Sequence, residues 1–309
     1  GGFITDAMGW RWIFLIFTIL SIIIFVISLF IKYESEENLD YPLDIFSLIT
    51  CIIAFMGIMF GFSNIVDYGF SLIYVILPII IGVICLILFV RRQKGLEYPL
   101  INLKVLKNKY FVWGTVFVSV LYFTMCGINI LMPLFVQSVT LRSGTVSGLI
   151  LLPGTLVMIV FNFVGPLLAT KIGVRKVLII ASIFSIIGFG SMATYNLDTS
   201  VNFMIITQLI RCVGAGLGLT PAITWAMSMV SDDVEDATAV NNTSRQVVGA
   251  IGSAIVVVIM SLFAGGEIAH NIESVSAFSL TSILMLILTV ILLIIVILFI
   301  KNKEGIEKS

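Results

Sequence analysis

Long apolar stretches, each followed by a polar connector, repeat along the whole chain. A bilayer core of about 30 Å is crossed by a helix of about 20 apolar residues. One longer stretch, Thr199–Ser231, contains a single charged residue, Arg211. Eight others contain none: Ile13–Ile31, Ile45–Ile65, Gly69–Val90, Tyr110–Leu141, Ser143–Thr170, Val177–Leu197, Val247–Gly266 and Ser274–Ile300. The pattern predicts nine membrane-spanning helices, with Gly1–Ile4 as the tail of another.

Composition narrows the class of protein further. Hydrophobic residues make up 60% of the chain and charged residues only 11%, whereas soluble domains carry roughly a quarter charged residues. Disordered chains are polar and highly charged, and the formal net charge of +0 lacks the positive excess with which proteins bind nucleic acid. Alternating strands of about ten residues, typical of a membrane β-barrel, are absent. We therefore expect an all-α, multi-pass membrane protein without a nucleic-acid partner.

Lys and Arg residues fall mainly in alternate connectors, and this sets the expected orientation. Basic residues concentrate on the cytoplasmic side of membrane proteins. On one side of the predicted helices the connectors hold only Arg11 and Arg142. Fourteen basic residues lie on the other side: Lys32, Arg91, Arg92, Lys94, Lys104, Lys107, Lys109, Lys171, Arg175, Lys176, Arg245, Lys301, Lys303 and Lys308. We expect this second side, with the C-terminus, to face the cytoplasm of a cell-membrane protein.

Two longer polar connectors, Tyr33–Asp44 and Arg91–Lys109, divide the chain on the same side. In the second connector, apolar residues stand among lysines: Ile101, Leu103, Val105 and Leu106. This mixture fits a short segment lying on the lipid headgroups and a plain solvated loop equally well.

No group of polar residues points to an enzyme, a cofactor or a metal site. Every Asp and Glu falls in a connector or at the end of an apolar stretch, so none is expected at membrane depth. The sole histidine, His270, is expected to be solvated in an outer connector. Single cysteines, more than thirty residues apart, indicate buried apolar positions and neither ligands nor disulfides: Cys51, Cys85, Cys126 and Cys212.

Arg211 is the one charge expected deep in the membrane. Ten residues separate it from Val201, which is about 15 Å of helix and half of the hydrocarbon core. A charge at that depth costs on the order of 3 kcal/mol. We therefore expect Arg211 to face a polar cavity or a partner, and we weigh this above a side chain that reaches out to the interface.

The helix that carries Arg211 also holds small residues and a proline. Glycines allow helices to approach closely in lipid, which serves packing as well as gating: Gly214, Gly216 and Gly218. Pro221 interrupts the backbone hydrogen bonding and predicts a bend. Deep polar side chains need partners in the bundle or in a water-filled cavity. With Arg211, our candidates for a substrate cavity are Asn129, Asn162, Gln208 and Trp225.

The stretch Pro166–Lys176 (PLLATKIGVRK) resembles the cytoplasmic loop signature G-x-L-A-D-R-x-G-R-R-K of the major facilitator superfamily. Thr170 stands where the family has the aspartate of a charge-relay lock between bundles, Lys171 and Val174 replace arginines, and Gly165 falls one residue early. The resemblance implies a cytoplasmic gate formed by Gly165, Thr170, Lys171, Gly173, Arg175 and Lys176.

Four more stretches resemble the fourteen-span drug:proton antiporters of that superfamily. Arg211 resembles the arginine of an R-x-x-x-G motif in helix four of a bundle, and Asn241–Gly252 (NNTSRQVVGAIG) resembles N-T-x-R-Q-x-G-x-x-G. Trp10–Phe14 (WRWIF) resembles the segment that enters span six. Pro99–Phe111 (PLINLKVLKNKYF) resembles the segment before the second bundle. Together the matches follow the order and the topological positions of this multidrug-efflux subfamily.

The resemblance implies the major facilitator fold and a division of the chain into parts. The chain opens with Gly1 and no Met, so we expect a C-terminal fragment that begins at the end of span five. The implied parts are the end of a first bundle at 1–32, two linking helices at 41–92, a cytoplasmic loop at 93–109, a complete six-helix bundle at 110–301 and a tail at 302–309.

The resemblance also implies proton-coupled efflux of hydrophobic or cationic drugs by alternating access of two bundles. The expected partners are the lipid bilayer, such a substrate and protons. Coupling carboxylates are expected in the first bundle, whereas the acidic stretch Asp232–Asp236 is expected to be a solvated helix end that pairs with Arg245. A transporter of a defined metabolite and a non-transporting scaffold or sensor remain as alternatives.

Overall fold

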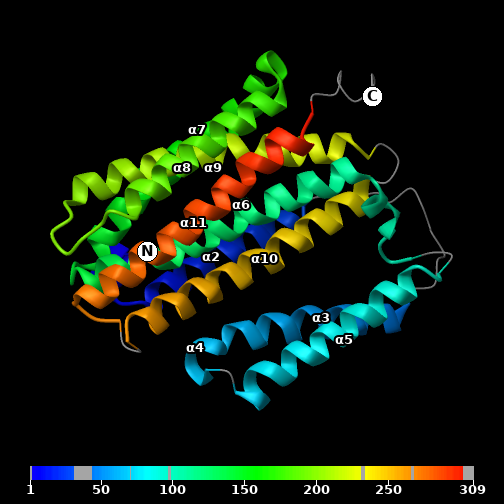
Figure 1. Ribbon diagram of the computed structural model, residues 1–309. Coiled ribbons are helices and arrows are strands. Elements are labelled where there is room, and N and C mark those ends of the chain that lie inside the picture. The colour runs from blue at the N-terminus through cyan, green and yellow to red at the C-terminus, as the bar shows by residue number, and fades with distance from the viewer. Residues whose placement is uncertain are drawn as a thin grey trace.

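Helices account for nearly all of the fold in the computed structural model (Figure 1). The structure describes residues 2–30, 44–69, 71–96, 99–230, 234–265 and 268–301. Within these ranges no strand occurs, and nine helices are long and apolar enough to cross a membrane. The predicted all-α fold with nine spans is thereby confirmed. The 302–309 tail, most of the Tyr33–Asp44 connector, and Asp232 with Asp233 lie outside the described residues.

The observed spans begin and end within five residues of the predicted boundaries, except at the start of α10. They are α2 (Arg11–Ser28), α3 (Ile45–Ser63), α5 (Leu77–Gln93, preceded by the π-helical η1, Leu72–Ile76), α6 (Lys109–Leu134, continued by the π-helical η3, Phe135–Val139), α7 (Gly144–Ile172), α8 (Val174–Met192), α9 (Val201–Ser228), α10 (Val234–Phe263) and α11 (Ile272–Phe299). The short elements are α1 (Gly2–Met8), α4 (Ile65–Tyr68) and the 3-10 turn η2 (Leu103–Lys107).

Helix α10 begins at Val234, thirteen residues before the predicted start at Val247. The prediction required an uninterrupted apolar run, and Arg245 ended that run. A helix of 30 residues is about 45 Å long, so its polar first turns can continue beyond a hydrocarbon core of about 30 Å. Arg245 therefore lies inside a helix, and its assignment to a connector was wrong.

Helices α6 to α11 pack against one another around a common core (Figure 1). Helix α9 contacts α7 and α8, α10 packs against α6, and α11 contacts α8, α6 and α10. At one end of this core the rings of Phe135 and Phe278 lie 4.1 Å apart, and Tyr195 stacks on Phe278 at 5.4 Å. Because all three rings are almost fully buried, they join α11 and η3 to the connector between α8 and α9.

Helices α3 and α5 form a hairpin that lies beside α10 (Figure 1). Glycines set the short distance between the two helices. A Cβ atom on Gly57 would lie 2.7 Å from the carbonyl oxygen of Pro78, and one on Gly82 would lie 2.8 Å from that of Ala54. In lipid, where no hydrophobic force drives helices together, such close backbone packing stabilises a helix pair.

Helices α1 and α2 are joined at Gly9, whose φ of +87° is readily adopted only by glycine. Helix α1 packs against α7. Helix α2, in contrast, has no buried residue and exposes apolar side chains on every face. A helix that is apolar all round belongs in lipid or against other membrane segments.

Candidate translocation site

Arg211 lies near the middle of α9 and is almost completely buried, with 4% of its surface exposed. Its Nε donates a hydrogen bond to Oε1 of Gln208 at 3.1 Å, and its Nη2 donates to Sγ of Cys212 at 3.0 Å. No carboxylate among the described residues forms an ion pair with it. Because a buried cation without a counter-charge is costly in a membrane, Arg211 is a strong candidate for a functional side chain.

Glycines on the two neighbouring helices enclose this polar cluster of Gln208, Arg211 and Cys212. A Cβ atom on Gly188 of α8 would lie 2.6 Å from Cβ of Arg211. One on Gly154 of α7 would lie 2.9 Å from Sγ of Cys212 and 3.1 Å from Cγ of Gln208. The cluster therefore sits between α7, α8 and α9 in the interior of the bundle, and neither Arg211 nor Gln208 lines the cavities at the two ends of α7 described below.

A cavity of about 640 Å³, named the inner cavity after the predicted orientation, opens where α7 meets α8, beside the last turns of α9. Its lining residues are Pro166, Ala169, Thr170, Lys171, Ile172, Gly173, Val174, Pro221, Thr224, Trp225 and Ser228. Nε1 of Trp225 donates to the carbonyl oxygen of Lys301 at 3.1 Å, which fixes the indole in the wall. A cavity of this volume with mainly apolar walls is typical of a small-molecule site.

The loop signature turns the chain from α7 into α8 at this cavity. Gly173 has a φ of +87°, a backbone conformation that favours glycine. Nη2 of Arg175 donates to the carbonyl oxygen of Ile297 in α11 at 2.7 Å. The hydroxyl of Thr170 donates to a carbonyl of its own helix at 2.8 Å, so it supplies no charge in place of the family's aspartate. Lys176 is exposed at the start of α8.

The three glycines that follow Arg211 face three different helices. A Cβ atom on Gly214 would lie 2.6 Å from a carbonyl oxygen of α8, and one on Gly216 would lie 2.7 Å from a carbonyl oxygen of α7. At Gly218 the nearest atom is a leucine methyl group of α6, at 3.1 Å. Gly214 and Gly216 thus permit close packing of α9 against α8 and α7.

Contacts between α7 and α9 continue toward the inner cavity. The hydroxyl of Thr220 donates to Oδ1 of Asn162 at 3.1 Å. Next to it, the ring of Pro221 packs against Gly165, where an added Cβ atom would lie 3.0 Å from Cγ of the proline. Asn162 thus has a partner on the neighbouring helix, whereas Asn129 is exposed on α6. The structure brings Trp225 to the inner cavity together with the loop signature but leaves the five cavity candidates spread along the bundle.

Comparison with known proteins decides the family. Residues 1–253 match the sequence model of the Major Facilitator Superfamily. The chain belongs to the Major Facilitator Superfamily. Lincomycin resistance protein LmrB of Listeria innocua is 31% identical over 266 residues, which cover 84% of this chain and 55% of that protein.

Two further relatives come from Bacillus subtilis. Its lincomycin resistance protein LmrB is 29% identical, again over 84% of this chain and 55% of the relative. Its multidrug transporter protein MdtP is 23% identical over 88% of this chain and 51% of the relative. The chain thus spans about half the length of these relatives. The predicted superfamily is confirmed, and the names of the relatives support its drug-efflux branch.

Sequence reasoning missed Asp6, which lines a second cavity of about 590 Å³ at the opposite end of α7, named the outer cavity after the predicted orientation. One carboxylate oxygen of Asp6 accepts hydrogen bonds from the backbone N and the hydroxyl of Thr145, at 2.7 and 2.6 Å, in the first turn of α7. Pro133 and Gln137 line the same cavity. Asn129 precedes Pro133 by one helical turn and shares its face. The available signal was an acid two residues after the apolar segment Gly1–Ile4.

A second cation, Arg245, lies inside a helix of this superfamily member. Sequence reasoning had assigned this residue to a connector. Its Cζ lies 5.5 Å from the ring centroid of Tyr122 on α6, within the range of a cation–π contact. Its Nε is buried without a hydrogen-bond partner among the described residues. The expected pairing with the acidic stretch was wrong for Asp236, which accepts a hydrogen bond from the backbone N of Asn102 at 2.9 Å.

Proposed function

We propose that the full-length protein is a secondary active transporter that exports hydrophobic or cationic toxic compounds in exchange for protons. Helix α9 carries this proposal, because one helix holds a buried charge at its middle and lines the inner cavity at its end. A charge kept at membrane depth despite its cost is typical of a transport pathway. The relatives named for lincomycin resistance and multidrug transport add independent support.

The cavity walls favour a hydrophobic substrate. Trp225, Pro221 and the apolar residues of the α7–α8 junction offer an aromatic and aliphatic surface. Among the described lining residues, Lys171 is the one that carries a charge. The guanidinium of Arg211 does not line this cavity, so a cationic group on the substrate would not meet it at contact distance. We propose that Arg211, Asn129, Asn162, Gln208 and Trp225 act in or beside the substrate pathway, with the loop signature as its cytoplasmic gate.

Alternating access would expose the two ends of α7 in turn, and each end borders a cavity of similar volume. At the outer end Asp6 bonds to Thr145 and thereby joins α1 to α7. At the inner end α7 borders the larger cavity. We infer that rocking of two bundles about a midplane site would expose each end in turn. The basic connectors and the C-terminus would then face the cytoplasm.

Proton coupling requires a carboxylate that is alternately exposed to the two sides. In the described part of α6 to α11, acids occur only near the helix ends, as Glu235, Asp236 and Glu273 do. We therefore propose that the coupling acids belong to the half of the full-length relatives that this chain does not match. In this proposal residues 1–32 end the first bundle, 41–92 form the linking helices, 93–109 a cytoplasmic loop, and 110–301 the second bundle.

The test is transport by the full-length gene product in inverted membrane vesicles. With an acidic lumen, a fluorescent cationic dye should accumulate inside, and a protonophore should abolish the accumulation. Cells that express the protein should also tolerate more lincomycin than cells with an empty vector. Dye accumulation that is independent of the pH gradient would refute proton coupling.

The alternatives give different results in the same vesicles. A transporter of a defined metabolite would release lumenal protons when that metabolite is added and would leave the dye unmoved. A scaffold or sensor would move neither protons nor any of the compounds, although the protein is present in the membrane. Either result would overturn the efflux proposal.

A further inference from the structure

A third cavity, of about 450 Å³, lies between the end of α5 and the start of α6. Its lining residues are Gln93, Lys94, Leu96, Pro99, Asn102, Leu103, Lys104 and Lys107. Of these described residues, three are lysines and none is acidic. Because two membrane-spanning helices end here, the cavity lies at the level of the lipid headgroups.

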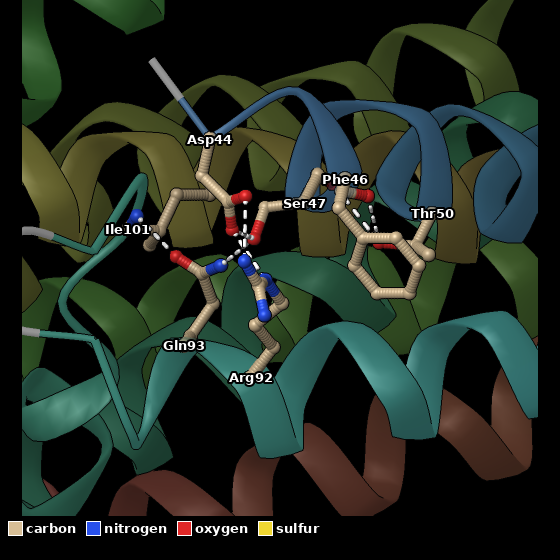
Figure 2. Close-up of polar contacts among 7 residues, drawn as sticks. All are labelled: Asp44, Phe46, Ser47, Thr50, Arg92, Gln93 and Ile101. Atoms are coloured by element: carbon tan, nitrogen blue, oxygen red, sulfur yellow. Dashed lines mark hydrogen bonds and ion pairs between the residues drawn. The ribbon is translucent and has the colours of Figure 1, made fainter. Parts of the chain in front are cut away.

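Hydrogen bonds and packing fix the walls of this lysine cavity. Figure 2 shows that the buried Gln93 bridges three segments: its Nε2 donates to Oγ of Ser47 on α3 at 2.6 Å, and its Oε1 accepts from the backbone N of Ile101 at 3.2 Å. Val105 of η2, 2% exposed, packs into the core formed by α6, α9 and α10. The amide of Asn108 donates to a carbonyl at the end of α9 at 2.7 Å. The cavity is thus a formed feature of the fold.

The neighbouring arginine has a counter-charge, whereas the three lysines have none among the described residues. Nε and Nη2 of Arg92 donate to the two carboxylate oxygens of Asp44 at 2.6 and 2.9 Å (Figure 2). No carboxylate in the described ranges pairs with any of the three lysines, which are all exposed. Counted along the sequence, segment 91–109 holds six basic residues and one acid, Glu97. Asp236 is the one described acid that bonds to the wall, where it accepts from the backbone N of Asn102 at 2.9 Å. Three lysines against this single carboxylate leave a positive excess at the cavity.

Apolar surface continues from the lysine cavity along α5. Leu96 also lines an adjoining cavity of about 400 Å³, whose wall includes Phe46 and Leu88. On η2, Leu106 is 46% exposed among the lysines. A soluble anion would leave these side chains uncovered, whereas a phospholipid brings an anionic phosphate and acyl chains together. Basic pockets at the membrane surface bind the headgroups of anionic lipids.

We propose that the lysine cavity binds the headgroup of an anionic phospholipid. Lys94, Lys104 and Lys107 contact the phosphate, and the apolar side chains of Leu96 and Leu103 receive the glycerol and the upper acyl chains. The bound lipid joins the α3–α5 hairpin to the start of α6 through the bilayer surface. This site depends on the membrane-spanning helices and does not depend on the proposed transport activity.

Photo-labelling of the purified full-length gene product tests this site. The probe is phosphatidylglycerol with a photoreactive group, compared with a phosphatidylcholine probe that has the same acyl chains. Adducts within residues 93–109 are quantified by mass spectrometry after digestion with a protease that does not cut at lysine. The test variant combines Lys94→Gln, Lys104→Gln and Lys107→Gln. A matched control removes three other exposed lysines from the same side: Lys109→Gln, Lys176→Gln and Lys301→Gln.

We expect the test variant to lose labelling of 93–109 by about tenfold or more, and the control to stay within about twofold of the wild-type chain. On the wild-type chain, the phosphatidylcholine probe should label this segment weakly. Its labelling should not exceed the level that the phosphatidylglycerol probe reaches on the test variant. Equal labelling by both lipids, or unchanged labelling of the test variant, would overturn the proposal. Loss of labelling in excess inorganic phosphate would assign the cavity to a soluble anion and would overturn it as well.

A milder measurement covers the case in which the triple variant does not fold. The exposed Lys104 is reversed in charge by Lys104→Glu, and the wild-type protein is labelled at rising salt concentrations. Because exposed charges are screened by salt, labelling of the wild-type protein should decrease as the KCl concentration is raised from about 0.1 to about 0.5 M. The reversed charge should lower labelling severalfold at low salt. Labelling that is indifferent to both changes contradicts the site.

Discussion

At the scale of single residues, the partners of Arg211 explain how α9 keeps a charge in its interior. Both hydrogen bonds go to side chains of the same helix, Gln208 and Cys212. The sequence predicted a buried apolar role for Cys212, yet its sulfur accepts a hydrogen bond from the guanidinium. These neutral partners accept part of the hydrogen bonds that the guanidinium can donate, but they do not compensate its positive charge. Because an uncompensated buried charge is costly, removal of Arg211 should not destabilise the helix.

Replacement of Arg211 tests this separation of function from stability. In the full-length protein, Arg211→Leu should lower proton-driven efflux by about tenfold or more, because a charge in the pathway is lost. The amount in the membrane and the melting temperature should stay the same or rise, because the cost of a buried charge is removed. Efflux assays and thermal unfolding in detergent measure the two effects. Full activity of the variant would reduce Arg211 to a structural residue.

At the scale of elements, glycines decide where helices of the bundle touch. Gly188 lies where α8 meets Arg211, and Gly190, two residues on, has only one neighbouring atom, at 3.9 Å from an added Cβ. Helix residues two positions apart point in different directions, so only Gly188 of this pair contacts Arg211. The two positions therefore separate the effect of close helix packing from the effect of the glycine residue itself. The sequence alone does not distinguish them.

The substitutions Gly188→Ala and Gly190→Ala form a matched pair on this helix. The first places a methyl group 2.6 Å from Cβ of Arg211 and should destabilise the protein by about 1–3 kcal/mol through overpacking. The second meets open space and should stabilise it by up to about 1 kcal/mol, since alanine favours helix. Thermal unfolding of both variants measures this. Equal effects would show that α8 and α9 are not in close contact at Gly188.

The ion pair at the base of the hairpin gives a prediction on pH. The guanidinium of Arg92 and the hydroxyl of Ser47 lower the pKa of Asp44 to about 2, from an ordinary value of about 3.9. A lowered pKa means that the contribution to stability is complete above about pH 4 and is lost as the pH falls toward about 2. The pair is therefore fully formed throughout the physiological range.

Thermal unfolding of Asp44→Asn beside the wild-type protein checks this pH dependence. The variant should melt at a lower temperature, and the difference should be constant between pH 5 and 8, since Asp44 stays ionised there. Glu235, which is exposed in the first turn of α10, offers a control as Glu235→Gln, with no expected change of the difference with pH. A difference that shrinks as the pH falls from 8 to 5 would contradict the assigned pKa.

At the scale of the whole molecule, the two ends of the bundle carry different features. One end holds the inner cavity, the loop signature and the lysine cavity, which all lie at the ends of α5, α7 and α9. The other end holds the outer cavity and the contact between Asp6 and Thr145. The proposed direction of transport depends on which end faces the cytoplasm.

Thiol labelling measures that orientation directly. In a full-length variant without native cysteines, Lys107→Cys and Lys171→Cys should both be protected in intact cells from a membrane-impermeant maleimide and should react after the cells are opened. Leu141→Cys, at an exposed position of the opposite side, should react in intact cells. Opposite behaviour of positions 107 and 171 would refute the span count and, with it, the proposed function.

The sequence predicted the helices well and their polar contacts poorly. Apolar runs located all nine spans, because lipid forces each backbone segment to satisfy its own hydrogen bonds as a helix. The same criterion misplaced the start of α10 at Arg245, since a helix can continue past the hydrocarbon with polar residues. Of the candidate site, Arg211 and Trp225 were recognisable as isolated polar or aromatic residues at depth, whereas Asp6 looked like any connector acid.

The sequence by itself determined the number of spans, the helical class and the family. The reason is that the hydrophobic thickness of the bilayer acts on each segment separately, and family motifs are local in the chain. Tertiary structure alone decided that Gly188 and Gly154 enclose the polar cluster, that Asp6 reaches Thr145, and that Gln93 closes the lysine cavity. Those contacts join residues far apart in the chain, and their partners are set by how the helices pack.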